Sequence, residues 1–484
     1  MTPPRFLPTD ALVALLLALA AATLYAATGL GRIYGNDGAM LAKWTALPEL
    51  AYGAYHNTLY LPAAGLLRHL LPDRLLADTI GPLWLARSLS ILPAALGLAF
   101  TFACCRLLGA TRAASTFATT LLAVSPAMWF FGAAIEVHAL HFLIVAFCAW
   151  VTLVAPWQRP GLALAITAAA FVLPYLSHQS APTLGPGWIL LVQCARRRRG
   201  PPFAWRTLLG IGVVLLLALG FGHMLVQWQR GRGFSLDLGD TLHTVGVWRR
   251  TFHPAVLNDA LLAPFAVLVP LLVMAALRRD IDGWLRGAAG LTLLPLLACV
   301  AWWGIPEHGG YLLGPAFLMA ALLAALWTTL PRRAATIGAA AAIAAQALAG
   351  WHDVREFDGE GFQLTDRVAR VQQAIGERGF VLSCNDNAPP ITIWLPAVQE
   401  LNLGDLLAGG LDQPVATLLA GSRTVLQLLA ANPTFVLDRS YTQRGDAPQR
   451  LHEFMAGFEA LLREQWQVEV RDDPSWPLWV LTRR

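Results

Sequence analysis

ASTFATTLLAVSPAMWFFGAAIEVHALHFLIVAFCAWVTLVA, residues 114–155, decides the fold of this chain. It holds two apolar runs, 114–134 and 137–155, and each has the length that crosses a bilayer core of about 30 Å as a helix. Glu136, His138 and His141 are the only acidic or histidine side chains in it, and it holds no lysine or arginine. The segment therefore predicts two membrane helices joined by a very short turn that carries ionisable side chains.

Further apolar runs lie on both sides of this pair. The predicted spans are 10–30, 82–104, 114–134, 137–155, 161–176, 181–195, 207–226, 260–277, 287–303, 311–330 and 334–350. Only 13% of the 484 residues are charged, against about 25% in soluble proteins. This composition excludes an ordinary soluble enzyme, a disordered chain and a nucleic-acid-binding protein. The fold class that we predict is an α-helical polytopic membrane protein with about 11 transmembrane helices.

The C-terminal region of the chain differs in charge and in pattern. Residues 1–350 contain 23 basic and 12 acidic residues, whereas residues 351–484 contain 12 basic and 18 acidic residues. In the latter region, alternating strand patterns at 379–383, 391–395, 434–438, 466–470 and 477–482 are interspersed with helical patterns at 361–377, 412–431 and 448–465. Strands and helices in this order are typical of a small α/β layer. We predict a transmembrane domain over 1–350, with a long first outer loop at 31–81, and an α/β domain over 351–484.

Arginine is distributed unevenly between the predicted loops. With the N-terminus inside, the inner segments hold Arg5, Arg106, Arg112, Arg159, Arg196, Arg197, Arg198, Arg199, Arg206, Arg278, Arg279, Arg286, Arg332 and Arg333. The positive-inside rule then places this side in the cytoplasm. We therefore expect a multi-pass protein of the bacterial inner membrane with a cytoplasmic N-terminus and a periplasmic C-terminal domain.

Acidic and histidine side chains gather at the predicted outer turns. Ionisable groups at a membrane are costly and are usually functional. Those that we single out are Asp37, Glu136, His138, His178 with Gln179, and Glu307 with His308 and Tyr311. Asp37, in Tyr34-Gly35-Asn36-Asp37-Gly38, suits a general base or a ligand of a divalent cation, and a helix cap is the alternative. For Glu136 the alternative is a solvated turn.

Four arginines in the predicted outer loop 227–259 stand against the positive-inside pattern. They are Arg230, Arg232, Arg249 and Arg250. The planar guanidinium group suits a phosphate, and contact with anionic lipid headgroups is the alternative.

Three motifs resemble the GT-C class of polytopic glycosyltransferases, in particular its bacterial protein O-mannosyltransferase-like branch. Asn36-Asp37-Gly38 with 55–62 (YHNTLYLP) is similar to the first-loop motif of that branch. Residues 131–140 (FGAAIEVHAL) resemble its alanine-rich segment followed by glutamate, and 174–179 (PYLSHQ) resemble its outer histidine turn. The segment 307–313 (EHGGYLL) is similar to a turn of aminoarabinose and mannosyl transferases, although Gly310 stands where arginine is usual.

The resemblance implies a reaction and roles for these residues. It implies a polyprenyl-phosphate-linked sugar as donor and an inverting transfer, on the outer face, to a hydroxyl of a lipid, polysaccharide or protein of the cell envelope. We expect Asp37 to be the general base, and Glu136 to position the acceptor or to hold Mg²⁺ or Mn²⁺ together with Asp37. Substrate-binding roles fall to His56, His138, His178, Gln179, Arg230, Arg232, Glu307, His308 and Tyr311. We predict no cofactor other than that divalent cation.

Three other classes of function stay open at this stage. A transporter or flippase of lipid-linked sugars needs ionisable sites near the bilayer midplane, often in paired repeats; here the acids map to span ends and no repeat is evident. A glycan ligase or polymerase shares the donor chemistry, and the sequence does not separate it from single-sugar transfer. A membrane scaffold without catalysis leaves the acids at the span ends unexplained.

Overall fold

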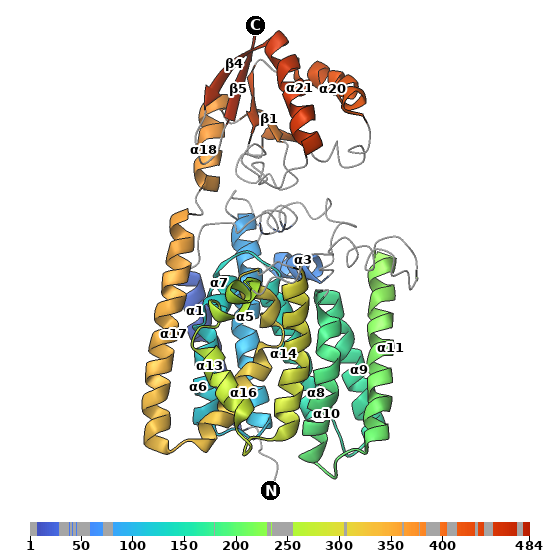
Figure 1. Cartoon of the computed structure of the whole chain (residues 1–484), viewed down its shortest axis with the longest axis vertical. Helices are drawn as coiled ribbons and strands as arrows, with labels where there is room; N and C mark the ends of the chain where they lie inside the picture. The colour runs from blue at the N-terminus through green and yellow to red at the C-terminus, as the bar shows by residue number, and fades with distance from the viewer. Residues whose placement is uncertain are drawn as a thin grey trace. The chain divides into compact units, whose positions relative to one another are not determined.

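A computed structural model gives the arrangement of helices and strands in Figure 1. It describes residues 7–28, 38, 41, 45, 59–70, 81–178, 180–229, 234, 255–303, 307–360, 363–376, 378–383, 397–403, 414–430, 434–439, 449–471 and 478–484. The chain forms two compact units. The first comprises residues 1–30, 47–70 and 85–357, and the second comprises 31–46, 71–84 and 358–484.

The first unit is entirely helical in the residues described. Its elements are α1 (Pro8–Thr28), α3 (Tyr60–Leu70), α5 (Gly81–Leu107), α6 (Arg112–Ala123), α7 (Pro126–Ala133), α8 (His138–Val154), α9 (Pro160–Ser177), η2 (Ala181–Leu184), α10 (Gly185–Arg197), α11 (Trp205–Gln229), η3 (Asn258–Leu262), α13 (Leu268–Leu277), α14 (Gly283–Trp303), η4 (Glu307–Gly309), α15 (Gly310–Leu313), α16 (Ala316–Thr329) and α17 (Arg332–Glu360). Every predicted span overlaps one or two of these helices. The polytopic helical fold is therefore confirmed.

The helices differ in whether each is long enough to cross a bilayer by itself. Six of those described, in α1, α5, α9, α11, α14 and α17, are long and apolar enough to cross a membrane alone. Two predicted spans are bent pairs instead: α6 and α7 meet at 64°, and residues 307–313 meet α16 at 74°. Counting each pair as one span gives up to eight. The shorter helices α8, α10 and α13 account for the other predicted spans.

Local sequence explains both bends. Ser125 begins α7 by accepting a hydrogen bond from the Met128 N–H, and Pro126 at the first helical position cannot continue α6. Gly314 and Pro315 separate α15 from α16. Because proline lacks an N–H, it marks where a helix starts anew.

The buried and exposed apolar side chains are distributed as expected for a protein surrounded by lipid. Helix α16 is buried along most of its length, from Ala316 to Ala324, so it forms the centre of the unit. On α11, by contrast, exposed apolar side chains are spread along the helix: Leu209, Val213, Leu216, Leu217 and Phe221. Exposed leucines of this density fit a surface that faces acyl chains rather than water.

Arginines close one end of the unit. Buried Asp10 of α1 accepts hydrogen bonds from Arg106 (3.2 Å) and Arg112 (2.9 Å). Arg198 donates to the carbonyl of Leu108, and Arg199 donates to that of Ala155. The last carbonyls of a helix have no partner within the helix, so these arginines stabilise helix ends that the bilayer would otherwise leave unsolvated. The predicted inner segments therefore do meet at one end of the bundle.

The second unit contains a mixed five-stranded sheet in the order β2-β1-β3-β5-β4. The strands are β1 (Gly379–Ser383), β2 (Val398–Asn402), β3 (Thr434–Asp438), β4 (Trp466–Arg471) and β5 (Leu478–Arg483). β1 runs parallel to β2 and β3, and β5 runs antiparallel to β3 and β4. Helices α20 (Val415–Leu429) and α21 (Gln449–Gln465) share one apolar core with the sheet, and α18 (Gln363–Ile375) packs in another.

The α/β pattern is confirmed, with one added strand. The predicted strands at 379–383, 434–438, 466–470 and 477–482 coincide with β1, β3, β4 and β5. The strand predicted at 391–395 lies outside the described residues. Strand β2 was not predicted, because the sequence Val398-Gln399-Glu400-Leu401-Asn402 is largely polar; it is a strand at the edge of the sheet, paired only with β1. Helix α17 runs past residue 350 and ends at Glu360.

Gly187 provides a test of the helix packing. It lies on α10 against α14, where a β-carbon would come within 1.8 Å of Thr292 Oγ1 and 2.4 Å of the Ala288 carbonyl oxygen. We expect Gly187→Ala to reduce the free energy of unfolding in detergent by about 1–3 kcal/mol, the usual cost of overpacking. Gly210→Ala on α11 is the control, since nothing lies within 4 Å of its added carbon. Equal stability of the two variants would contradict this packing.

Candidate functional site

The candidate site lies where the two bent pairs meet α8, at the end of the bundle opposite the arginines. The turn 134–137 leads from α7 into α8, and α8 ends at the arginine-bound Ala155. α15 contacts α7 and α8, and η4 reaches α8 through Glu307 and His138 and reaches α7 through His308 and Phe130. Figure 1 shows α7 in the upper part of the helical bundle. The short helices therefore bring 134–138 and 307–311, which are far apart in the sequence, side by side.

Glu307 is the central acceptor of the site. Its Oε2 accepts a hydrogen bond from His138 Nε2 at 2.7 Å, and its Oε1 accepts one from the Tyr311 hydroxyl at 2.9 Å. The Glu307 side chain is 30% exposed, whereas His138 is only 3% exposed. Two donors on one carboxylate favour its charged form and fix its orientation. Glu307 is therefore suited to orient other groups.

His178, the cap residue of α9, completes a cluster of rings. Its ring centroid lies 5.3 Å from that of His138 and 5.4 Å from that of Tyr311. The Ser180 N–H points at His178 Nδ1 at 3.1 Å, and the Ser180 hydroxyl lies 2.8 Å from the same atom. Nδ1 is thus the acceptor, so the neutral ring carries its proton on Nε2. His178 accordingly offers an N–H donor to this site.

His141 has a structural role at the next turn of α8. The Ser177 hydroxyl donates to the Pro174 carbonyl, so it accepts a hydrogen bond from His141 Nδ1 at 2.7 Å. His141 Nε2 is buried and has no partner among the described residues. A β-carbon on Gly314 would stand 2.7 Å from that nitrogen, so the glycine occupies the approach to it. His141 therefore fastens α8 to the end of α9.

Two glycines let α15 lie against α8. A β-carbon on Gly310 would stand 2.6 Å from His138 Cδ2, just as one on Gly314 would meet His141. Gly310, which begins α15, and Gly314, which caps its end, thus receive histidines three residues apart on α8, and small residues at such spacing let helix backbones approach closely. Gly310 therefore has a steric reason to be glycine.

Glu136 is buried and held by its surroundings. Its Oε2 accepts a hydrogen bond from the Val137 N–H at 2.9 Å, and its backbone N–H and carbonyl both bond to Ser90 Oγ on α5, each at 3.2 Å. A carboxylate at the start of α8 is stabilised by the helix dipole. The alternative interpretation of Glu136 as a solvated turn residue is wrong, because only 5% of it is exposed.

His308 points away from the Glu307 cluster. Its Nε2 donates to Asp353 Oδ2 of α17 at 2.5 Å, and its ring lies 4.7 Å from that of Phe130. The backbone has φ of +36° at Glu307, +50° at His308 and +79° at Gly309. For residues other than glycine, this left-handed conformation costs about 1–2 kcal/mol each. With this backbone conformation, the Glu307 side chain points to His138 and the next side chain, His308, points to Asp353.

The structure thus unites some of the predicted residues. His138, His178, Glu307 and Tyr311 form one cluster, while Glu136 precedes it on the chain and His308 bonds elsewhere. Asp37, His56, Gln179, Arg230 and Arg232 lie outside the described residues. Sequence reasoning missed Ser90, Ser177 and Asp353; only Asp353 gave a signal, as an acid directly after a long apolar run.

The described residues hold no group of three histidine, cysteine, aspartate or glutamate side chains that fits a metal ion. The cluster around Glu307 instead offers hydrogen-bond donors and a fixed negative charge. In the cluster, the rings of His138, His178 and Tyr311 lie within 5.5 Å of one another, centroid to centroid, and Glu307 bonds to His138 and Tyr311. This arrangement can bind a polar headgroup whose tail lies among the helices.

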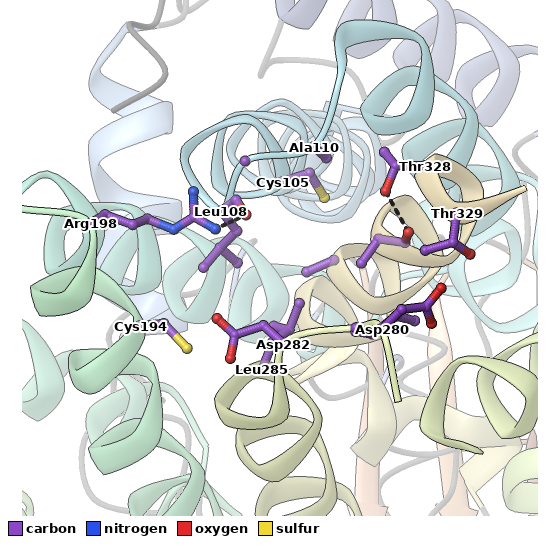
Figure 2. A pocket seen from close by; sticks show the side chains of 14 residues that line it. Cys105, Leu108, Ala110, Cys194, Arg198, Asp280, Asp282, Leu285, Thr328 and Thr329 are labelled. Atoms are coloured by element: carbon purple, nitrogen blue, oxygen red, sulfur yellow. Dashed lines mark hydrogen bonds between the residues drawn. The ribbon is translucent and has the colours of Figure 1, made fainter. Parts of the chain in front are cut away.

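A cavity of roughly 180 Å³ lies at the arginine end and is not this site. Figure 2 shows it lined by Cys105, Arg198, Asp282 and Thr328, among others. Its charged groups bond within the protein: Arg198 to the Leu108 carbonyl, and Asp282 to Arg197 at 3.3 Å. These pairs connect the turns at the arginine end, and they pair Arg198 and Asp282 within the protein.

A broken-helix bundle with a polar cluster at one end, followed by a small α/β unit, has the architecture of the GT-C fold class. Among solved structures, the chain is similar to ArnT from Cupriavidus metallidurans bound to undecaprenyl phosphate, with a TM-score of 0.64 and 13% identity. The match covers 96% of this chain and 97% of that chain. The apo state of ArnT matches over the same shares, with a TM-score of 0.59 and 13% identity.

These likenesses establish the fold. They agree with the GT-C fold that the resemblance implies, and they do not support the O-mannosyltransferase-like branch in particular. No family model matches the chain, and no curated protein matches it.

The bond between His138 and Glu307 is testable by a double-mutant cycle. We expect His138→Gln and Glu307→Gln to show a coupling of about 1.5–3 kcal/mol in the free energy of unfolding, the range for hydrogen bonds to charged groups. The matched control is Arg278→Gln with Asp280→Asn, an ion pair at the protein surface. We expect no measurable coupling there. Additive effects at His138 and Glu307 would refute the bond.

Proposed function

We propose that this protein is a membrane glycosyltransferase that moves a sugar from a polyprenyl-phosphate carrier to an acceptor hydroxyl. The observation that carries the proposal is the match, over nearly the whole chain, to an ArnT structure bound to undecaprenyl phosphate. The polar cluster of His138, His178, Glu307 and Tyr311 supports it, since it stands beside apolar helices at one end of the bundle. A donor with a polar head and a polyprenyl tail suits both environments.

The proposed reaction is a single displacement at the anomeric carbon. The acceptor oxygen forms a bond to that carbon, the bond from the carbon to the phosphate oxygen breaks, and the polyprenyl phosphate leaves with the electron pair. A general base takes the hydroxyl proton, and the configuration inverts. In this proposal Asp37 is the base, and the His178 Nε2–H donates to a phosphate or sugar oxygen.

Glu307 and Glu136 take separate roles in the proposal. Glu307 orients the His138 ring and the Tyr311 hydroxyl, and both of its oxygens are already hydrogen-bonded. Such a carboxylate is a poor proton acceptor. Glu136, held by Ser90 and Val137, positions the acceptor. If transfer requires Mg²⁺ or Mn²⁺, Asp37 and Glu136 would hold the ion in this proposal.

The remaining predicted residues extend the substrate site. We propose that Arg230 and Arg232 bind the donor phosphate and that His56 and Gln179 contact sugar or phosphate. The acceptor is a lipid, a polysaccharide or a protein of the cell envelope, on the periplasmic side of a bacterial inner membrane. The orientation proposed rests on the arginine-rich end, which the positive-inside rule places in the cytoplasm.

Transfer of labelled sugar from polyprenyl-phosphate sugars by the purified protein tests the proposal. We expect Asp37→Asn to lower kcat by about 10²–10⁴-fold, the contribution of a general base. Glu307→Gln should lower kcat about tenfold or more through the loss of the oriented His138 ring. Asp280→Asn, at the opposite end, is the control with the same chemical change and should transfer at the wild-type rate.

The outcomes separate the other functions. Movement of lipid-linked sugar across proteoliposomes without transfer would replace this proposal with a transporter or flippase, and transfer of whole glycan chains would replace single-sugar transfer with ligation. Full activity in EDTA would rule out the expected Mg²⁺ or Mn²⁺ requirement. Wild-type kcat in a folded Asp37→Asn variant would move the base to another residue, with Glu136→Gln the next variant to measure.

A further inference from the structure

We propose that Asp353 of α17 is a positioning residue of this site, and that it acts by holding the turn that carries Glu307. The inference rests on the proposed function, because Glu307 belongs to the site of that reaction. Asp353 bonds to His308, the residue after Glu307, and not to the cluster itself. It therefore influences Glu307 through the backbone of the turn.

The turn needs restraint from more than one side. Glu307 and His308 both have positive φ angles, which L-residues with side chains rarely keep without support. On one side, His138 and Tyr311 hold the Glu307 carboxylate. On the other side, the His308 ring packs on Phe130, and its Nε2 donates to Asp353 at 2.5 Å. Two histidine–carboxylate pairs thus fix two neighbouring residues: Glu307 contributes the carboxylate of one pair, and His308 contributes the imidazole of the other.

Helix α17 is docked so that Asp353 is itself fixed. One turn earlier, Gly350 approaches so closely that a β-carbon would stand 2.7 Å from the Val124 carbonyl oxygen and 2.9 Å from the Trp129 ring. Trp351 lies 6.2 Å from Trp129, ring to ring, and Val354 is buried. Asp353 therefore belongs to a part of α17 that is packed against the rest of the unit, and its side chain reaches the turn.

Gly309 closes the third side of the turn. A β-carbon there would stand 2.7 Å from Pro264 Cβ and 3.1 Å from the Ala260 carbonyl oxygen. The turn is thus confined by α8, by η3 with the residues after it, and by α17. The turn is joined to α17 by the ion pair of His308 with Asp353. Removal of one carboxylate should therefore release the turn without removing a packed side chain.

The experiment compares transfer by the wild type, Asp353→Ala, Asp353→Glu and the control Asp280→Ala. We expect Asp353→Ala to lower kcat about 10- to 100-fold, the scale of a misplacement near 1 Å, with the donor KM changed less than twofold. Asp353→Glu should restore part of the lost kcat, and Asp280→Ala should match the wild type. In Asp353→Ala combined with Glu307→Gln, the loss should be less than the product of the single losses, because both act through one turn.

A thermal cycle measures the ion pair without any transfer assay. We expect Asp353→Ala and His308→Ala each to lower the Tm, and the double variant to lower it no further than the larger single change. Wild-type kcat in Asp353→Ala, or additive Tm changes, would overturn the inference. If the wild type transfers no sugar, the proposed function fails, and the inference that Asp353 positions the site for transfer fails with it; the Tm cycle then shows separately whether the pair exists.

Discussion

The structure of the site depends on keeping a carboxylate charged at the edge of an apolar bundle. Glu307 meets that constraint by accepting hydrogen bonds from His138 and Tyr311, because an unpaired charge in such a place is very costly. His138 must then start a helix directly opposite, which the short turn after α7 provides. Gly310 must also lack a side chain, because the His138 ring occupies that space. One pair therefore explains a turn, a broken span and a glycine.

The two ends of the bundle pair their charged side chains with different chemistry. At the arginine end, arginines donate to helix-terminal carbonyls and to Asp10, which leaves charges balanced locally. At the other end, histidines and carboxylates are paired around strained backbone and short helices. The polar groups of a proposed transferase site accordingly belong to the broken end.

The sequence predicts the helices and strands of this protein better than it predicts the side-chain contacts of the site. Each apolar run overlaps one or two of the described helices, and the strand pattern located β1, β3, β4 and β5, because burial in lipid or in a sheet repeats along the chain. The polar strand β2 escaped, since its pairing with β1 depends on backbone bonds that composition does not record. Within the site, the sequence predicted Glu136, His138, His178, Glu307 and Tyr311 as separate turn residues, without their partners.

By itself, the sequence determined a membrane bundle, its arginine-rich end, the acidic and histidine-bearing turns and a following α/β unit. These follow from the local preference of each segment for lipid, water or a sheet. Only the tertiary structure decided that Glu307 bonds His138 while His308 turns to Asp353, 45 residues further along the chain. The reason is physical: side-chain direction in the strained turn depends on positive φ angles, and distant helices hold those angles in place.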